Sequence, residues 1–389
     1  MKILVIGNTG LNYSNNSTNN RMVKIFEVLN KKYQYGLDYY KLRNATLEVE
    51  YINYINKQEN SNPIKAFKTI LSNKTKHDIC IAETFNAAIV AYLLYKFKNI
   101  PFIWRQFGTT FNDELETHFF KPKTLLKYIL HRIIANSKGC KAIVCTEDGC
   151  ANRILYLDKL KISPNKLYMV KNQRTEQKFE SIKKENSDNK FRIVQVGRIN
   201  PWKKIHILVS ALVSIRIKFP EIMENIELNI IGISQDVEYE NKLNSVIIKN
   251  NLQKNIFFKK DLEYDKIEKI FLETDLSVSL TAYNPIIESL QNGTPVITYE
   301  YGEIGEVFKN SEAVTIVAKN IKKSSMLSKE EENLIQKEVE DKIVELYQNR
   351  KKAEKIGKDG RKFVEDNFPT LDEHVEEIIN IYRKVINAL

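Results

Sequence analysis

Two cations, Arg198 and Lys203, lie in the segment VGRINPWKK, where a predicted strand ends and a predicted helix begins. The first N–H groups of a helix have no partner within the helix, so a helix start beside cations attracts anions. Guanidinium and ammonium groups suit a diphosphate. From placement alone two interpretations stay open, a diphosphate site or two solvated surface charges. The adjacent Lys204 is a weaker candidate for the same role.

A carboxylate, Glu288, lies in the segment NPIIESLQNGTPVIT, which carries clear turn signals. Pro285 suits the first turn of a helix, Gly293 its end, and Pro295 the restart into a strand. We therefore expect Glu288 in the first helical turn, placed to accept hydrogen bonds from the vicinal hydroxyls of a ribose. A carboxylate that only favours a helix N-terminus explains the same position.

Short apolar runs bounded by turn residues recur along the chain and predict buried strands. They occupy residues 3–6, 79–82, 102–104 and 142–145, then 193–196, 228–231, 276–279 and 295–298. Between them, apolar residues recur at helical spacing, as at Ile207, Leu208 and Ala211. The alternation predicts an α/β fold with parallel sheets and crossover helices. Ligands of such sheets bind beyond the carboxyl ends of the strands.

One polar segment, residues 173–190, interrupts this alternation and is the best predicted linker. It separates an N-terminal domain, residues 1–172, from a C-terminal domain, residues 191–369, and a chain of 389 residues suits two domains. We expect two doubly wound domains that face a central cleft. A last helix, residues 370–389, opens with capping-box spacing, and one placement open to it is against the N-terminal domain.

Taken together, the two polar segments resemble the C-terminal domain of the retaining GT-B glycosyltransferases, of the glycosyl transferases group 1 or family 4 type. The family pattern runs Gly-Arg, then Lys, then a Glu-bearing helix closed by Gly-x-Pro-Val, and this chain has that order. The resemblance covers most of residues 191–310, including NIIG at 229–232 and DLSVS at 275–279. It implies two Rossmann-like domains.

In the family, the arginine and lysine neutralise the donor diphosphate and the glutamate holds the ribose, roles that the resemblance assigns to Arg198, Lys203 and Glu288. Further donor contacts are expected from Gly10, Gly197, Gly232, Thr281, Tyr283, Asn284, Pro285 and Ile286.

The N-terminal half resembles the family less closely. Gly10, in the motif GNTG after the first strand, corresponds to a glycine-containing loop that reaches the phosphates, with an ordinary tight turn as the alternative. The segment WRQFGTT resembles the acceptor side of the cleft and makes Arg105, Gln106 and Gly108 candidates there. Asn172 matches an asparagine near the interdomain crossing, and a turn role is equally open.

One departure from the family concerns the sugar end of the donor. The family usually has two glutamates separated by seven residues, the first near the transferred sugar, and Leu280 stands at that distance before Glu288. Either Thr281, Tyr283 and Asn284 contact the sugar instead, or the loop is shortened. The donor base, the sugar, and whether this loss alters or abolishes activity are left open.

The segment HFFKPKTLLKYILHRII, residues 118–134, combines a broad apolar face with basic and aromatic residues. That composition is typical of a helix that docks on an anionic membrane surface. A buried face with a solvated basic rim explains it as well. A lipid-linked acceptor would favour the membrane interpretation, with Lys121, Lys123 and Lys127 as the predicted lipid contacts.

The composition narrows the classes of partner. A net charge of +11 favours an anionic ligand, but the cations are scattered and no nucleic-acid motif occurs, so we expect no nucleic acid. The four cysteines lack zinc spacing and fit a reducing compartment. The opening residues MKILVIG predict a buried strand rather than a signal peptide, and the apolar stretch at 87–94 is too short to span a bilayer.

The sequence therefore predicts a glycosyltransferase of hexosyl or related type. It would move a sugar from a nucleotide diphosphate sugar to a glycan or lipid-linked acceptor, with retention implied by the resemblance alone, in surface polysaccharide or glycoconjugate assembly. No metal site is evident and no cofactor is expected, since cations can stabilise the leaving diphosphate. A non-catalytic nucleotide-sugar-binding protein and a nucleotide-sugar epimerase are the alternatives. The predicted location is cytoplasmic, or peripheral on the inner membrane face; acceptor, linkage and oligomeric state stay open.

Overall fold

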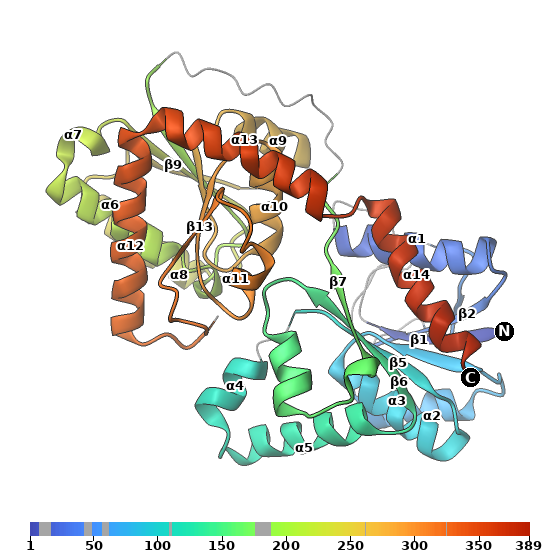
Figure 1. Cartoon of the computed structure of the whole chain (residues 1–389). Helices are drawn as coiled ribbons and strands as arrows, with labels where there is room; N and C mark the ends of the chain where they lie inside the picture. The colour runs from blue at the N-terminus through green and yellow to red at the C-terminus, as the bar shows by residue number, and fades with distance from the viewer. Residues whose placement is uncertain are drawn as a thin grey trace. The chain divides into compact units, whose positions relative to one another are not determined.

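The chain folds into two units, each built around a parallel sheet (Figure 1). The first unit comprises residues 1–147, 151–173 and 371–389, and the second comprises residues 148–150 and 174–370. The computed structural model describes residues 1–7, 17–42, 49–56, 62–108, 111–175, 188–260, 262–323 and 325–389, without the side chains of residues 17–20, 264 and 265. The predicted α/β class with two Rossmann-like sheets is confirmed.

The described strands of the first unit form one parallel sheet in the order β3-β2-β1-β4-β5-β6-β7. These strands are β1 (Lys2–Gly7), β2 (Gly36–Lys41), β3 (Asn53–Tyr54), β4 (Ile79–Ala82), β5 (Phe102–Gln106), β6 (Cys140–Glu147) and β7 (Leu167–Lys171). The helices are α1 (Ser17–Lys31), α2 (Pro63–Ser72), α3 (Phe85–Lys98), α4 (Phe111–His118), α5 (Pro122–Asn136) and α14 (Leu371–Asn387), with short turns η1 (Ile154–Lys159) and η2 (Pro164–Lys166).

Alternate residues of β1 enter two different cores, as expected for a strand covered on both faces. Ile3 and Val5 pack with α1 and α14, whereas Leu4 and Ile6 pack with α2 and α3. The last helix, α14, packs across α1 (Figure 1). Asp372 of α14 pairs with Lys24 of α1. The C-terminal end of the chain is thus part of the first unit.

The described strands of the second unit form a parallel sheet in the order β10-β9-β8-β11-β12-β13. These are β8 (Phe191–Val196), β9 (Ile226–Ile231), β10 (Ile256–Lys259), β11 (Leu276–Val278), β12 (Val296–Tyr299) and β13 (Val314–Val317). Its helices are α6 (Ile205–Lys218), α7 (Pro220–Met223), α8 (Val237–Lys249), α9 (Tyr264–Leu272), α10 (Tyr283–Gln291), α11 (Ile304–Val307), α12 (Lys329–Gln348) and α13 (Arg350–Asn367), with the turn η3 (Pro201–Lys203).

Both sheets reverse their strand order beside the first strand of the unit. In the second unit β8, β9 and β10 follow one another outward, and β11 then adds on the other side of β8. In the first unit β4 adds to β1 in the same way. The crevice at such a switch point, at the carboxyl ends of the strands, is the usual ligand position in open parallel sheets. The segments after β8 and β11 carry most of the predicted donor residues.

Candidate functional site

The carboxyl ends of β8 and β9 approach one another through a pair of glycines. Gly197 and Gly232 have φ values of 147° and 151°, which residues with a side chain rarely adopt. A Cβ atom on Gly232 would lie 2.1 Å from the carbonyl oxygen of Gly197. Only glycine permits this approach, so both predicted glycines have a structural reason to be where they are.

The turn η3 after β8 is held by two side chains that the sequence prediction did not assign. Asn200 caps the turn and accepts a hydrogen bond from the backbone N–H of Lys203 at 3.3 Å. Gln195 donates to the carbonyl oxygen of Lys203 at 2.9 Å. The dipeptide Asn200-Pro201 is itself a helix-start signal that could have revealed the cap. These bonds set the direction of the Lys203 side chain.

The ammonium of Lys203 bridges the switch point of the second sheet. It donates to the carbonyl oxygen of Thr281 at 3.1 Å, and the Thr281 hydroxyl donates to the carbonyl oxygen of Trp202 at 2.6 Å. This reciprocal pair joins the segment after β8 to the segment after β11. Burial and the nearby charge of Arg198 lower the pKa of Lys203 to about 8.

Arg198 lies on the surface beside this lysine. Its side chain is exposed, and no hydrogen bond or ion pair engages its guanidinium within the part of the chain that the structure describes. One cation is thus fixed and partly desolvated, and the other is accessible. Two neighbouring positive charges with unused donors form an arrangement that an anion such as a diphosphate would stabilise.

Glu288 lies in the second turn of α10, not in the first. The expectation placed the helix start at Pro285, but the helix already begins at Tyr283 because proline is tolerated throughout the first turn. The half-buried carboxyl has no hydrogen bond or ion pair among the described residues, including none with Arg198 or Lys203. Burial raises the pKa of Glu288 to about 7. The carboxyl group therefore remains available to a ligand.

The residues predicted for the sugar end divide into buried and exposed side chains. Asn284 is exposed and Pro285 is half-buried at the start of α10. Tyr283 and Ile286 pack into the core of the second unit, and Ile286 offers no side-chain surface to a ligand. Thr281 is buried, because its hydroxyl and carbonyl oxygen join the Lys203 bridge. Of this group, Asn284 presents the most accessible polar side chain.

Leu280, at the family position of the first glutamate, is fully buried in the core of the second unit. The residue before it, Ser279, donates its hydroxyl to the carbonyl oxygen of Ala282 at 2.7 Å and tightens the loop that leads into α10. A carboxylate at position 280 would face an apolar core without solvation, which is costly. The loop therefore turns this position inward, where leucine is stabilising.

The described candidates of the first unit, Arg105, Gln106 and Gly108, do not form a comparable site. Gly10 lies outside the described residues. Gly108 is exposed, and the Gln106 side chain donates to the carbonyl oxygen of Phe107 at 2.8 Å. Arg105 is only 1% exposed, and neither its Nε nor its Nη1 has a hydrogen-bond acceptor within the described chain. The guanidinium carbon lies 5.4 Å from the ring centroid of Phe107.

Arg105 belongs to a buried polar cluster between the first sheet and α14. Arg21 donates to the side-chain oxygen of Asn172 at 2.6 Å, so Asn172 has a buried partner in the first unit. The ring of His374 bonds to the carbonyl oxygen of Lys171 at 2.7 Å. Burial, together with the charges of Arg21 and Arg105, lowers the pKa of His374 to about 3. The histidine is therefore neutral, and this cluster is part of the packing of the unit.

Cys150 is a further neighbour of the candidate site that sequence reasoning missed. Residues 148–150 follow β6 but belong to the second unit, where Gly149 accepts a hydrogen bond from Glu303 at 2.9 Å. The sulfur of Cys150 lies close enough to Lys203 that a negative charge on the sulfur favours the ammonium form of Lys203. No sequence signal places residue 150 beside residue 203. All four cysteines are free thiols.

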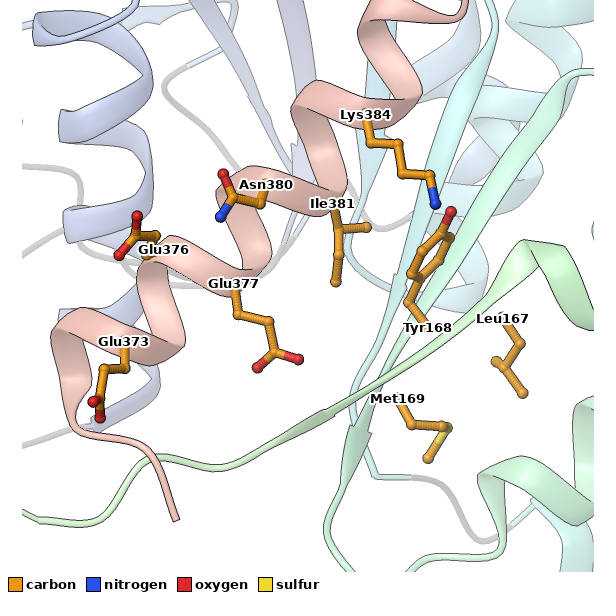
Figure 2. A pocket seen from close by; sticks show the side chains of 9 residues that line it. All are labelled: Leu167, Tyr168, Met169, Glu373, Glu376, Glu377, Asn380, Ile381 and Lys384. Atoms are coloured by element: carbon orange, nitrogen blue, oxygen red, sulfur yellow. The ribbon is translucent and has the colours of Figure 1, made fainter. Parts of the chain in front are cut away.

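An open cavity of about 710 Å³ lies in the first unit between β7 and α14. Figure 2 shows Tyr168 and Lys384 pointing toward one another, and Glu377 pointing from α14 toward β7. Glu373, Glu376 and Glu377 make the lining mainly acidic. Such a lining repels a diphosphate, so we do not place the nucleotide here. Within the described residues, no group of three potential ligands surrounds a metal position, and no helix is both long and apolar enough to cross a bilayer.

Comparison with known proteins identifies one family model within the second unit. Residues 176–363 match the family model described as glycosyl transferases group 1. An uncharacterized glycosyltransferase of Methanocaldococcus jannaschii is 22% identical over 334 residues, which cover 81% of this chain and 77% of that protein.

Two solved structures share the fold over nearly the whole chain. Anabaena Alr3699/HepE in complex with UDP-glucose has a TM-score of 0.66 at 14% identity and full coverage of both chains. WaaG, a glycosyltransferase involved in lipopolysaccharide biosynthesis, has a TM-score of 0.65 at 10% identity, covering 97% of this chain and 99% of that one. At these identities the likeness establishes the fold, which is of the GT-B type.

Proposed function

We propose that this chain, whose residues 176–363 match the glycosyl transferases group 1 family model, transfers a sugar from a nucleotide diphosphate sugar to a glycan or lipid-linked acceptor. The observation that carries the proposal is the Lys203–Thr281 bridge at the switch point of the second sheet, with the exposed Arg198 beside it. This position is where open parallel sheets bind ligands.

The chemistry that these groups support is stabilisation of the leaving diphosphate. When the bond between the sugar and the diphosphate breaks, negative charge grows on the departing oxygen. Lys203 is held in place before the reaction, so it stabilises that charge without reorganising. Arg198 can add a charged hydrogen bond to the same group. Glu288, with its unoccupied carboxyl, would accept hydrogen bonds from the ribose hydroxyls.

Several finer features belong to the same proposal. We propose a hexosyl or related sugar, transferred with retained anomeric configuration, without a cofactor and with the nucleotide sugar itself as the donor substrate. The UDP-glucose bound by HepE makes uridine nucleotides the first donors to test. Retention is decided by the anomeric configuration of the product, measured by the coupling constant of its anomeric proton.

We further propose that the acceptor is part of a surface polysaccharide or glycoconjugate that is assembled on a lipid at the inner face of a membrane. The role of WaaG in lipopolysaccharide biosynthesis supports this direction, since that protein shares the fold. The chain would then act in the cytoplasm or at the membrane surface. Nucleic acid has no place in this proposal.

The decisive experiment is a donor panel followed by a transfer assay. A nucleotide sugar that binds the folded chain must raise its unfolding temperature, so a panel of UDP-, GDP-, ADP- and dTDP-sugars identifies the donor class. Release of the nucleoside diphosphate, with and without crude lipid-linked glycan, then reports hydrolysis or transfer. Donor binding without any turnover would favour a non-catalytic binding protein. Conversion of the donor to its epimer without an acceptor would favour an epimerase. No stabilisation by any member of the panel contradicts the proposal.

A further inference from the structure

The outer face of α5 carries large apolar side chains that the described residues leave exposed. Phe120 is 92% exposed in the turn before the helix, and Leu126 is 59% exposed on it. The full set, called here the α5 ridge, is Phe119, Phe120, Leu125, Leu126, Ile129 and Ile133. The sequence allowed two interpretations of this segment. One face of α5 is buried, as the second interpretation expects, but the ridge lies outside that face and is exposed.

The spacing of the ridge follows the helix. Leu126, Ile129 and Ile133 are separated by three and four residues, so they form one stripe along α5. Phe119 is held against this stripe by an edge-to-face contact with Tyr128, with ring centroids 5.6 Å apart. Phe120 projects beyond it. A single exposed leucine would require no explanation, but a continuous aliphatic and aromatic stripe does.

The inner face of α5 packs into the core of the first unit. His131 is buried and stacks between Phe85 and Phe111, with ring centroids 3.7 and 4.3 Å away. Burial is the main cause that lowers the pKa of His131 to about 3, so the ring is neutral. Thr124, Ile134 and Ala135 complete the buried side. The fully buried contacts of α5 therefore come from this face and not from the ridge.

Cations flank the ridge and no acidic residue interrupts it. The chain has no Asp or Glu between His118 and Lys138, and the side chains of Lys121, Lys123 and Arg132 are exposed. Lys127 differs from the expectation. Its ammonium lies 2.6 Å from Glu114 and 4.2 Å from the ring centroid of Phe111, so it ties α5 to α4. Lys127 is a local structural residue and not a lipid contact.

We infer that the α5 ridge inserts into the interfacial region of an anionic membrane leaflet, with Phe120 and Leu126 entering the acyl boundary and Lys121, Lys123 and Arg132 meeting the lipid phosphates. Apolar burial and attraction to anionic lipid are the two contributions that hold an interfacial helix. A basic rim on a segment that itself carries no acidic residue favours a negatively charged surface. This inference rests on the proposed function in one respect, because a membrane surface is where a lipid-linked acceptor would meet the protein. Binding to lipid itself requires no nucleotide-sugar donor.

The test measures co-sedimentation of the full chain with vesicles made of equal parts phosphatidylglycerol and phosphatidylcholine, and with vesicles of phosphatidylcholine alone. The wild-type chain should bind the anionic vesicles. The double variant Phe120→Ser/Leu126→Ser should lose at least ~10-fold in partition coefficient, since burying such side chains is strongly favourable. The triple variant Lys121→Glu/Lys123→Glu/Arg132→Glu should lose on the order of 100-fold.

Matched controls lie in the second unit. Ile217 of α6 is 74% exposed, so Ile217→Ser removes an equally exposed apolar side chain. Lys249, Lys254 and Lys351 are exposed, and their replacement by Glu changes the net charge as the α5 triple variant does. Both controls should bind the vesicles as the wild-type chain does. All altered ridge residues are exposed, so unfolding temperatures should stay unchanged and report intact folding.

A positive readout comes from Phe120→Trp. Its fluorescence should shift to shorter wavelength with anionic vesicles and stay unshifted with phosphatidylcholine alone. Unchanged vesicle binding by the Phe120→Ser/Leu126→Ser variant overturns the inference. So does a wild-type dimer in solution that this variant dissociates, because the ridge would then be covered by a second copy. The nucleotide-sugar panel is independent of lipid, so failure here and failure of the proposed function are distinguishable.

Discussion

A glycine lies at the end of the first strand in each unit, but the side chain beside it is acidic in one unit and basic in the other. Gly7 ends β1, and a Cβ atom placed on it would lie 2.1 Å from a carboxylate oxygen of the buried Glu83. Gly197 follows β8, and its Cβ atom would lie 3.4 Å from Cε of Lys203. Both positions adjoin the switch point of their sheet. The fold provides two equivalent places, and among the described neighbours a basic side chain, which attracts an anion, adjoins the second.

The largest effect is expected when one of the two cations beside Gly197 is removed. Arg198→Ala and Lys203→Ala should each lower turnover by roughly 10² to 10³, because each removes a preorganised partner of the leaving diphosphate. Steady-state kinetics with the identified donor measure this loss, and Lys254→Ala, an exposed lysine of the same unit, is the control. Near-normal transfer by both variants would refute the assignment and the comparison of the two strand ends.

A smaller effect is a narrow pH range for nucleotide binding. In the proposed function, the carboxylate form of Glu288, favoured above its pKa of about 7, would accept the ribose hydroxyls, and the ammonium form of Lys203, favoured below its pKa of about 8, would hold the diphosphate. Affinity should therefore rise with pH through the first value, fall through the second, and change up to ~10-fold per pH unit outside that window. Calorimetric titration of the nucleotide across pH measures both limbs.

Two variants assign the limbs of this profile. Glu288→Gln should flatten the acidic limb and weaken binding by roughly 10-fold, the loss of a charged hydrogen bond. Lys203→Arg should flatten the alkaline limb, because a guanidinium stays protonated at these pH values. A wild-type profile without any decline above about pH 8 would show that the charge of Lys203 is not needed for nucleotide binding.

The glycines themselves predict a ranking of stabilities. Gly232→Ala places a methyl group against the backbone of Gly197, which cannot swing aside, and should cost about 3 kcal/mol or more. Gly7→Ala meets the ends of the Glu83 and Tyr39 side chains, which can shift at a cost of about 1–3 kcal/mol. Gly36→Ala makes only ordinary van der Waals contacts, with Lys2 at 3.5 Å and the carbonyl oxygen of Met1 at 3.8 Å, and serves as the nearly neutral control. Urea unfolding measures the three, and equal stabilities for Gly232→Ala and Gly36→Ala would contradict the close approach of β8 and β9.

The smallest expected effect concerns Arg105 in the first unit. Arg105→Met should change nucleotide affinity by less than ~2-fold, because Arg105 is buried and shares no partner with Arg198 or Lys203. The measurement is nucleotide titration of Arg105→Met beside Arg198→Ala. A loss as large as that of Arg198→Ala would mean that the first unit also contacts the donor. Burial of Arg105 would then be no ground for excluding it from the site.

Much of the second unit could be predicted because its signals are local. The apolar run Leu228–Ile231 lies within β9, and the glycine pattern marks the strand ends at Gly197 and Gly232. Less of the first unit was predictable. The strands β2 and β7 contain polar residues such as Asp38 and Lys171, so they do not stand out as apolar runs. Asp38 is nevertheless buried, because His77 lies 2.7 Å from its carboxylate.

The sequence by itself determined the α/β alternation, the order of Arg198, Lys203 and Glu288, and the width of the apolar face on α5, because each depends on residue type and spacing along the chain. Only the tertiary structure decided which of these groups are accessible. It placed Leu280 in the core, buried Arg105 under α14, paired Lys127 with Glu114, and left the α5 ridge uncovered. The physical reason is that burial and pairing depend on neighbours distant in the chain, and periodicity carries no information about which neighbour covers a face.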